Sequence, residues 1–446
     1  MTEPLQPLEP TPSQGDLTTT PLLTISHRWG RKLVEFRRMM LVAVPIGAFS
    51  GAGVSLLEYI CNNLTWDHLS QLPITVRLAF PIIGLLVSGY ILHLLQVGTV
   101  GMLNEVVQHY HSPPDKVILE EDGLKALACI STVGLGASLG LGGPSQWLGT
   151  RIAIYIRHFF SHFKNVRGIS KSHIILIGAA AGVSAIFRAP LAGTLLALET
   201  PFSKDIDSPV LLPAAAAALV SHLVHGYFYN DHPLLPFGSV ESHSWQVVLA
   251  TGAIGVAAGF LSRRFQRGLT YVRRRTGDWS WWSRALAGGI VTSGIALIAW
   301  YFYGDTWTLQ GGLPLAELSF SGKIIGTTAL ALLILKVIAV WATAGTTGVA
   351  GVLVVTLTIG SLLGAAVQPL LPMLPPNVAS ATAVCAYVAA NYNAPLTGVA
   401  LSAEWGGTGL LTLSWFPVLI AAWIGEGLAN TPSKKRMKHH HHHFLP

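Results

Sequence analysis

The chain contains few charged residues. Of its 446 residues, 51% are hydrophobic and only 11% are charged, whereas about a quarter of the residues in a soluble domain are charged. Six stretches contain no Asp, Glu, Lys or Arg, and most reach the roughly 20 residues that cross a bilayer. They are Met39–Leu57, Leu78–Asn104, Ala126–Thr150, Ser208–Asn230, Ser242–Ser262 and Ala285–Gly304. The sequence therefore excludes a soluble fold and predicts an integral membrane protein.

Cysteine is also scarce, and no chemical motif stands out. Cys61, Cys129 and Cys385 are far apart in the sequence and match no metal or redox spacing, so we expect them to pack in the interior. The apolar stretches contain no paired carboxylates, nucleophile elbow or metal-ligand spacing. We therefore predict no enzymatic activity, no cofactor and no metal site. The polar first 30 residues lack the apolar core of a signal peptide, and residues 1–32 are expected to form a disordered tail.

The net charge of +7 comes from basic residues that lie between the apolar stretches, which favours topology signals over nucleic-acid binding. The basic groups are Arg28, Arg31, Lys32, Arg37 and Arg38; Arg263, Arg264, Arg267, Arg273, Arg274, Arg275 and Arg284; and Lys434, Lys435, Arg436 and Lys438. By the positive-inside rule, both termini and the loop 263–284 face the cytosol. The segment 231–241, which has no Lys or Arg, is expected outside. The chain is thus predicted to be a multi-pass protein of the cell membrane.

Two similar segments indicate an internal duplication. The residues Ala189-Pro190-Leu191-Ala192-Gly193, followed by Glu199, match Ala394-Pro395-Leu396-Thr397-Gly398, followed by Glu404, at an offset of 205 residues. Each Pro is expected in the first turn of a new helix. We assign residues 33–230 and 242–430 to two membrane repeats. Such halves commonly have inverted topology and place broken helices near the midplane.

The longest window without charge, residues 337–403, is interrupted by Gly, Pro and Asn, so we expect several packed helices there. Elsewhere a dense glycine cluster is typical of a loop that opens a helix. It comprises Gly134, Gly136, Gly140, Gly142 and Gly143, followed by Pro144. The free amides of a helix N-terminus bind an anion without a cationic side chain. The alternative is a close helix crossing that glycine permits.

The sequence resembles that of the CLC family of chloride channels and transporters. The resemblance rests on Gly178-Ala179-Ala180-Ala181-Gly182, on the residues from Phe187 to Glu199, and on those from Asn393 to Glu404, and it extends over nearly the whole membrane region. It implies an all-α membrane fold with two inverted-topology repeats of tilted and broken helices. It further implies a homodimer with one pore per subunit.

Placed on this sequence, the family's three anion motifs are degenerate. The first falls on residues 98–102, where Thr99 still offers a hydroxyl group. The second falls on Gly140, Gly142 and Gly143, and the third on Gly351, Val352 and Leu353. The resemblance makes these residues the expected anion ligands, through backbone amides in the second and third motifs. Packing of a Thr against its own helix, or plain apolar packing of Val352 and Leu353, remains the alternative.

Three family features are missing. Gly142 stands where the family has its gating glutamate, and Thr200 stands where its exchangers have an internal proton-carrying glutamate. No residue convincingly replaces the family's pore tyrosine. Gly and Thr do not hold a proton at working pH, so we predict passive, proton-uncoupled movement of an anion, by a channel or a uniporter. Glu199 and Glu404 are expected to hold helix ends to neighbouring backbone.

Other functions remain open at this stage. Chloride is the expected ion, with fluoride, nitrate and bicarbonate as alternatives. A proton-coupled or fluoride-selective antiporter, and a membrane subunit that does not conduct, are the competing functions. The tail of residues 431–446 is basic and contains His439 to His443. It is either a purification tag or a natural cytosolic tail. A natural tail is either solvated or, when its histidines are protonated, plugs the inner vestibule.

Overall fold

The protein is nearly all helical. A computed structural model describes residues 21–97, 102–111, 119–160, 169–200, 208–229, 233–238 and 245–426. The first half contains α1 (Pro21–Glu58), the π-helix η1 (Tyr59–Trp66), α2 (Asp67–Ser70), α3 (Ile74–Arg77), α4 (Phe80–Leu94), α5 (Met102–His111), α6 (Leu119–Gly134), α7 (Gly142–Phe160), α8 (Lys171–Phe187), α9 (Pro190–Glu199) and α10 (Ser208–Phe228). The second contains α11 (Trp245–Thr276), α12 (Trp281–Tyr303), α13 (Leu313–Phe320), α14 (Gly326–Ala344), α15 (Leu353–Val367), the 3₁₀ helix η2 (Gln368–Leu370), α16 (Pro376–Tyr392) and α17 (Pro395–Glu426).

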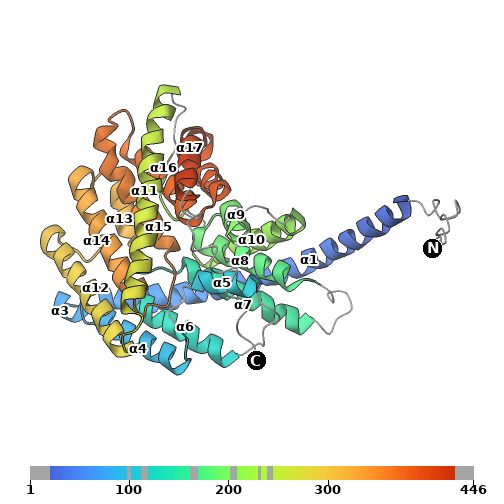
Figure 1. The fold of residues 1–446 in the computed structure, drawn as a ribbon, viewed down its shortest axis with the longest axis horizontal. Coiled ribbons are helices and arrows are strands. Elements are labelled where there is room, and N and C mark those ends of the chain that lie inside the picture. Colours follow the sequence, from blue (N-terminus) through green and yellow to red (C-terminus); the bar gives the residue numbers. More distant parts are fainter. Residues whose placement is uncertain are drawn as a thin grey trace, which may run out of the picture.

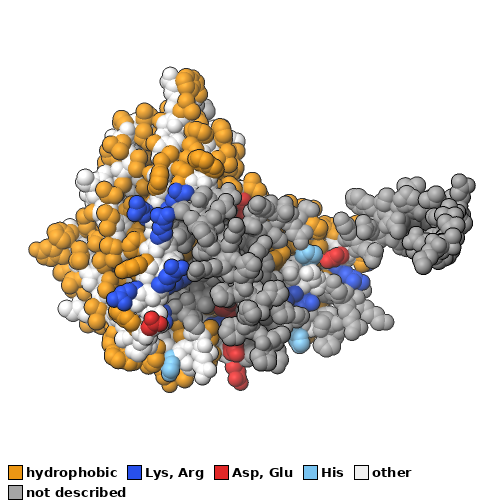
Figure 2. Space-filling model, viewed as in Figure 1, with side chains coloured by type: hydrophobic (Ala, Val, Ile, Leu, Met, Phe, Trp, Pro, Cys, Tyr) orange, Lys and Arg blue, Asp and Glu red, His pale blue; other side chains and the backbone are white. Residues whose placement is uncertain are grey.

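In the described ranges, 8 helical segments are long and apolar enough to cross a bilayer. They begin at Leu33, Ile74, Pro209, Trp245, Trp281, Gly326, Leu353 and Pro395. Apolar side chains cover most of the coloured surface on the left of Figure 2, and several Lys and Arg side chains lie at about mid-height on it. The prediction of an integral membrane protein with many apolar helices is therefore confirmed.

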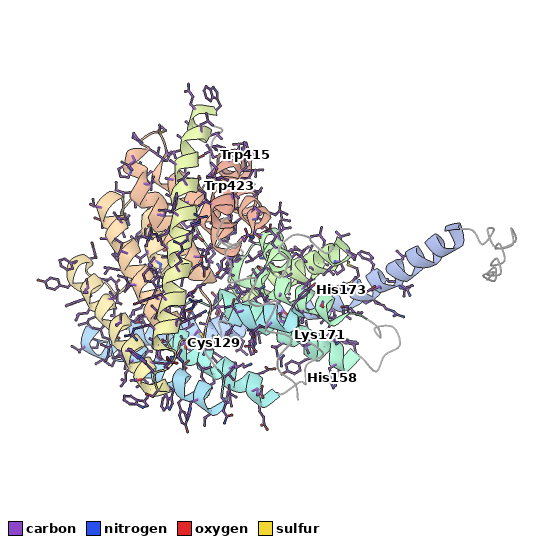
Figure 3. All side chains as sticks on the ribbon, viewed as in Figure 1. Cys129, His158, Lys171, His173, Trp415 and Trp423 are labelled. Atoms are coloured by element: carbon purple, nitrogen blue, oxygen red, sulfur yellow. The ribbon has the colours of Figure 1, made fainter. Side chains whose placement is uncertain are left out.

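The helices form one packed bundle, from which the N-terminal part of α1 projects (Figure 1). The most extensive helix contacts join α16 to α17, α7 to α8 and α1 to α10. Small residues permit these close approaches: a Cβ atom on Gly182 of α8 would lie only 1.9 Å from the carbonyl oxygen of Ser145 on α7. Cys61, Cys129 and Cys385 are free and buried, as expected, and Cys129 lies within the bundle (Figure 3).

The two matching segments adopt the same backbone structure. Arg188 directly follows α8 and Asn393 directly follows α16, and both residues are left-handed, with φ of 52° and 53° respectively. Helices α9 and α17 then begin at Pro190 and Pro395, as the sequence predicts. The window 337–403 contains the end of α14, all of α15 and α16 and the start of α17, which confirms the expectation of several packed helices.

Some predictions concern residues that the structure leaves undescribed. Thr99, the ends of the loop 231–241 and the tail 431–446 lie outside the described residues. Of the predicted tail 1–32, residues 1–20 also lie outside, and α1 begins at Pro21. The boundaries 33–230 and 242–430 for the two membrane repeats stay a prediction.

Candidate functional site: two helix starts beneath a vestibule

The second and third motifs, which are far apart in the sequence, meet through their backbones. The amide of Gly140 donates to the carbonyl of Gly351 at 3.0 Å, and the amide of Gly351 donates to the carbonyl of Gly140 at 3.0 Å. Two residues after each of these glycines a helix begins, α7 at Gly142 and α15 at Leu353. One helix start from each half is therefore fixed to the other by a reciprocal pair of hydrogen bonds.

Only glycine fits this contact. A Cβ on Gly351 would lie 2.4 Å from the amide nitrogen of Gly143, and one on Gly143 would lie 2.9 Å from the Cα of Gly351. A Cβ on Gly142 would lie 2.7 Å from the Cβ of Leu353. Gly142, which the resemblance aligns with the family's gating glutamate, thus faces Leu353, and this conformation leaves no room there for a side chain.

The helix starts leave backbone donors without helical partners. The first hydrogen bonds back along the chain are donated by Ser145 to the carbonyl of Leu141 at 2.8 Å, and by Thr356 to that of Val352 at 2.8 Å. The amides of Gly142 and Gly143 in α7, and those of residues 353–355 in α15, precede these bonds, so they carry the positive end of the helix dipole. In the described part of the chain, no carboxylate accepts from these amides.

Unpaired polar side chains follow directly in α7. Ser145 and Gln146 are fully buried and Trp147 is 3% exposed. Among the described residues, the Ser145 hydroxyl, both amide atoms of Gln146 and the indole nitrogen of Trp147 have no hydrogen-bond partner. Buried polar atoms are nearly always paired with protein, water or an ion. The first turns of α7 therefore offer polar atoms to something other than the described protein.

A vestibule with a volume of ≈ 540 Å³ leads to the two helix starts. Gly140, Leu141 and Val354 form the part of its lining that lies beside them. Most of the rest comes from the end of α1, from η1, α2 and α3 and from residues 305–314, and its charged members are Glu58, Asp67, Arg77 and Asp305. The vestibule thus connects a partly charged mouth with the glycines of the second motif.

Lys336 is a site residue that the sequence motifs did not indicate. It lies in α14 and is fully buried, and its Nζ donates to Ser138 Oγ at 3.0 Å, the Thr308 carbonyl at 2.9 Å and the Gln310 carbonyl at 2.5 Å. Gln310 also lines the vestibule. The signal was present in the sequence, because Lys336 is the single charged residue of an apolar helix, and such residues mark functional sites in membrane proteins.

Glu199 and Glu404 each accept hydrogen bonds from the start of a helix in the other repeat. Glu199 of α9 accepts from the amides of Leu396 and Thr397 at 2.9 and 2.8 Å, and from the Thr397 hydroxyl at 2.6 Å. Glu404 of α17 accepts in turn from the amides of Leu191 and Ala192 at 2.8 and 2.9 Å. The prediction that these side chains hold helix ends to neighbouring backbone is confirmed. Each half provides a glutamate to a helix start of the other half, as expected of two halves related by a two-fold axis.

Thr200, which the resemblance aligns with the internal proton position of the family's exchangers, directly follows the last residue of α9. Its hydroxyl donates to the carbonyl of Leu196 at 2.6 Å, one helical turn earlier. Thr200 is part-buried. The side chain is therefore engaged by its own helix, and a hydroxyl at this place does not exchange a proton at working pH.

Comparison with known proteins identifies the family. Residues 83–430 match the family described as Voltage gated chloride channel, and the chain belongs to this family. The curated protein "H(+)/Cl(-) exchange transporter ClcA" of Yersinia pestis bv. Antiqua (strain Angola) is 29% identical over 296 residues, which cover 63% of this chain and 60% of that protein. "Voltage-gated ClC-type chloride channel ClcB" of Escherichia coli O139:H28 (strain E24377A / ETEC) is 27% identical over 249 residues, or 50% of this chain and 56% of that protein. The chain thus spans less than two thirds of the length of these relatives.

Solved structures share the fold. One titled "Crystal structure of a CLC-type fluoride/proton antiporter" superposes with a TM-score of 0.74 at 22% identity, covering 87% of this chain and 95% of that one. Another, titled "X-ray crystal structure of a slow cyanobacterial Cl-/H+ antiporter", gives a TM-score of 0.76 at 18% identity, covering 90% and 97%. The predicted CLC-like fold of membrane helices is confirmed.

Proposed function

We propose that this CLC-family protein moves chloride, or a small anion like it, through the vestibule and between the starts of α7 and α15. The observation that carries the proposal is the joint at Gly140 and Gly351, which brings one helix start from each half to the vestibule. Amides at such ends attract an anion without holding it as tightly as a full charge. Lys336, behind the vestibule wall, adds a positive potential.

The anion ligands in this proposal are the backbone of Gly140, Gly142, Gly143, Gly351, Val352 and Leu353, together with the hydroxyl of Thr99. Unpaired atoms of Ser145 and Gln146 support a polar path along α7. We also propose that two copies assemble as a homodimer with one pore each, in the cell membrane and with both termini in the cytosol. Cross-linking in native membranes and protease accessibility of the termini test these two points.

For coupling, we propose passive transport without protons. The support is local: Gly142 has no side chain and no space for one, and the hydroxyl of Thr200 is bonded to its own helix. Proton-coupled exchange is the second candidate, and the comparisons favour it, because relatives and structural neighbours carry names such as H(+)/Cl(-) exchange transporter and fluoride/proton antiporter.

One experiment separates the candidates. The full chain is reconstituted in liposomes with a chloride gradient, and chloride efflux and internal pH are recorded together. We expect efflux that dissipates the gradient and moves no protons uphill. Sustained proton pumping driven by chloride contradicts the passive mechanism, while faster flux of fluoride than of chloride makes fluoride the substrate. A folded protein that passes no anion contradicts transport and favours a non-conducting membrane subunit.

A further inference from the structure

Side chains from three helices meet beside the vestibule, and one of them, Glu58, lines it. Glu58, the last residue of α1, accepts from His225 Nε2 of α10 at 2.8 Å. An amino group of the Arg188 guanidinium, at the end of α8, lies 3.8 Å from the other carboxylate oxygen. The same guanidinium lies 6.0 Å from the centre of the Tyr229 ring, which stacks on His225 at 5.1 Å. We call Glu58, Arg188, His225 and Tyr229 the Glu58–His225 cluster.

The imidazole of His225 has one nitrogen available for a proton. The side chain is fully buried, and its Nε2 is bonded to Glu58. Among the described residues, its Nδ1 has no hydrogen-bond partner. An imidazole whose Nε2–H is donated to a carboxylate keeps a free lone pair on Nδ1 when it is neutral. Proton uptake at this atom converts the hydrogen bond to Glu58 into a charged pair.

The cluster separates two cavities. Glu58 lines the vestibule, whereas Arg188 and Tyr229 line a second cavity of ≈ 830 Å³. The π-helix η1 begins directly after Glu58, and its residues Asn62 and Trp66 also line the vestibule. Single turns of π-helix often occur at functional sites. Members of the cluster therefore line both cavities, and Glu58 belongs to the wall of the vestibule.

The charges around His225 decide the effect of a proton. Glu58 faces it from α1, Arg188 from the end of α8, and Tyr229 from the end of its own helix. Further along, Tyr59 lies in η1 and Asp67 in α2. When the imidazole is neutral, the negative charge of Glu58 and the positive charge of Arg188 cancel. An imidazolium leaves the cluster with one positive charge beside the vestibule, which attracts anions.

We propose that the Glu58–His225 cluster is a proton-binding site that controls the entry of the anion into the vestibule. A proton from solution binds His225 Nδ1, no other bond is made or broken, and the added charge raises the local anion concentration. Acid on the vestibule side thus speeds anion entry. The inference rests on the proposed function, and it assigns to Glu58 and His225 a role in regulating the same path.

The test compares wild type with His225→Gln and Glu58→Gln in reconstituted liposomes. The amide of the first variant still donates to Glu58 but takes up no proton in this range. Between about pH 8 and about pH 5, wild-type anion flux is expected to rise about three- to tenfold. His225→Gln stays at the slow, high-pH rate throughout. Glu58→Gln, which removes the negative charge from the mouth, is faster than wild type at high pH and responds less to acid.

His173→Gln is the matched control, since His173 of α8 (labelled in Figure 3) also pairs with a glutamate, Glu35, at 3.2 Å, and neither residue lines the vestibule. It keeps the wild-type response. Infrared pH-difference spectra of wild type and His225→Gln measure imidazole protonation without transport. Loss of an imidazole signal in His225→Gln supports the site even in a protein that passes no anion. An unchanged spectrum, or a full pH response of flux in folded His225→Gln, overturns it.

Discussion

Four helices begin inside the membrane region: α7, α9, α15 and α17. Their N-termini differ in the groups that contact them. The starts of α9 and α17 are occupied by the carboxylates of Glu404 and Glu199. The starts of α7 and α15 are joined at Gly140 and Gly351, and unpaired polar atoms follow in α7. The same backbone dipole thus holds the carboxylate of a glutamate at one pair of helices, and at the other pair it is free for the mobile anion of the proposed function.

The two kinds of helix start are also expected to differ in what a substitution there changes, the stability of the fold or the transport of the anion. A glutamate bonded to a helix start of the opposite half links the two repeats, so the loss of that glutamate affects folding. The starts of α7 and α15 also link the two halves, through the bonds between Gly140 and Gly351, but they lie beside the vestibule, so their substitution is expected to affect flux. Four sets of substitutions test this division, in order from the largest expected effect to the smallest.

Removing a glutamate from an occupied helix start should have the largest effect. Glu199→Ala leaves the part-buried amide of Leu396 and the buried amide and hydroxyl of Thr397 without their acceptor, and we expect the free energy of unfolding to fall by about 3–5 kcal/mol. Glu404→Ala loses two hydrogen bonds rather than three and should cost about 1 kcal/mol less. Thermal unfolding in detergent measures both. Glu317→Ala, at an exposed position in α13, is the control and should unfold like wild type; equal unfolding of Glu199→Ala and wild type contradicts the structural role.

Adding a carboxylate to an unoccupied helix start should reduce flux. Gly142→Glu must displace Leu353, whose Cβ lies 2.7 Å from the new Cβ, and it places a negative charge at α7. We expect chloride flux at neutral pH, measured as efflux from liposomes, to fall by about tenfold and to recover partly in acid.

Gly142→Ala is the matched variant, because it adds the same Cβ without the charge. Its flux should fall less, and without recovery in acid. Identical pH profiles for the alanine and glutamate variants, in folded protein, place the anion path away from the start of α7.

Neutralising the buried lysine should have a smaller effect on transport. Lys336→Met removes the positive charge behind the vestibule wall, and we expect flux to fall about threefold at low salt and less at high salt. Single-channel current or liposome efflux measures the change. Lys323→Met alters an exposed lysine just after α13 and should leave flux unchanged. Equal reductions in both variants indicate a nonspecific loss of charge.

The kink in α17 should affect stability slightly and transport very little. Gly407 adopts φ 66° and ψ −164°, a conformation that essentially only glycine tolerates. Gly407→Ala should lower the free energy of unfolding by about 1–2 kcal/mol, although open space surrounds a new Cβ. Gly294→Ala also enters open space, but in the regular helix α12, and should be neutral or stabilising in the same thermal unfolding measurement. A stability loss shared by both variants contradicts the role of the backbone angle.

Much of the fold could be predicted because the hydrocarbon core of a membrane permits few backbone structures. A backbone in hydrocarbon must be helical, so apolar stretches such as Ala285–Gly304 predict helices such as α12. The duplicated Ala-Pro-Leu segments likewise predicted the starts of α9 and α17 and the roles of Glu199 and Glu404. Lys336 was missed because the three anion motifs contain no charged residue, whereas this lysine reaches the vestibule wall from a neighbouring helix.

The sequence by itself determined an all-helical membrane protein, its repeated segments and the glycine-rich starts of α7 and α15, because helix periodicity, helix breaks and the need to bury apolar surface are local properties. Only the tertiary structure decided which helix starts meet. The bonds between Gly140 and Gly351, the exchange of Glu199 and Glu404, and the contact of Glu58 with His225 join residues that are far apart in the sequence. Such pairings depend on how the two halves pack against each other, which no local pattern specifies.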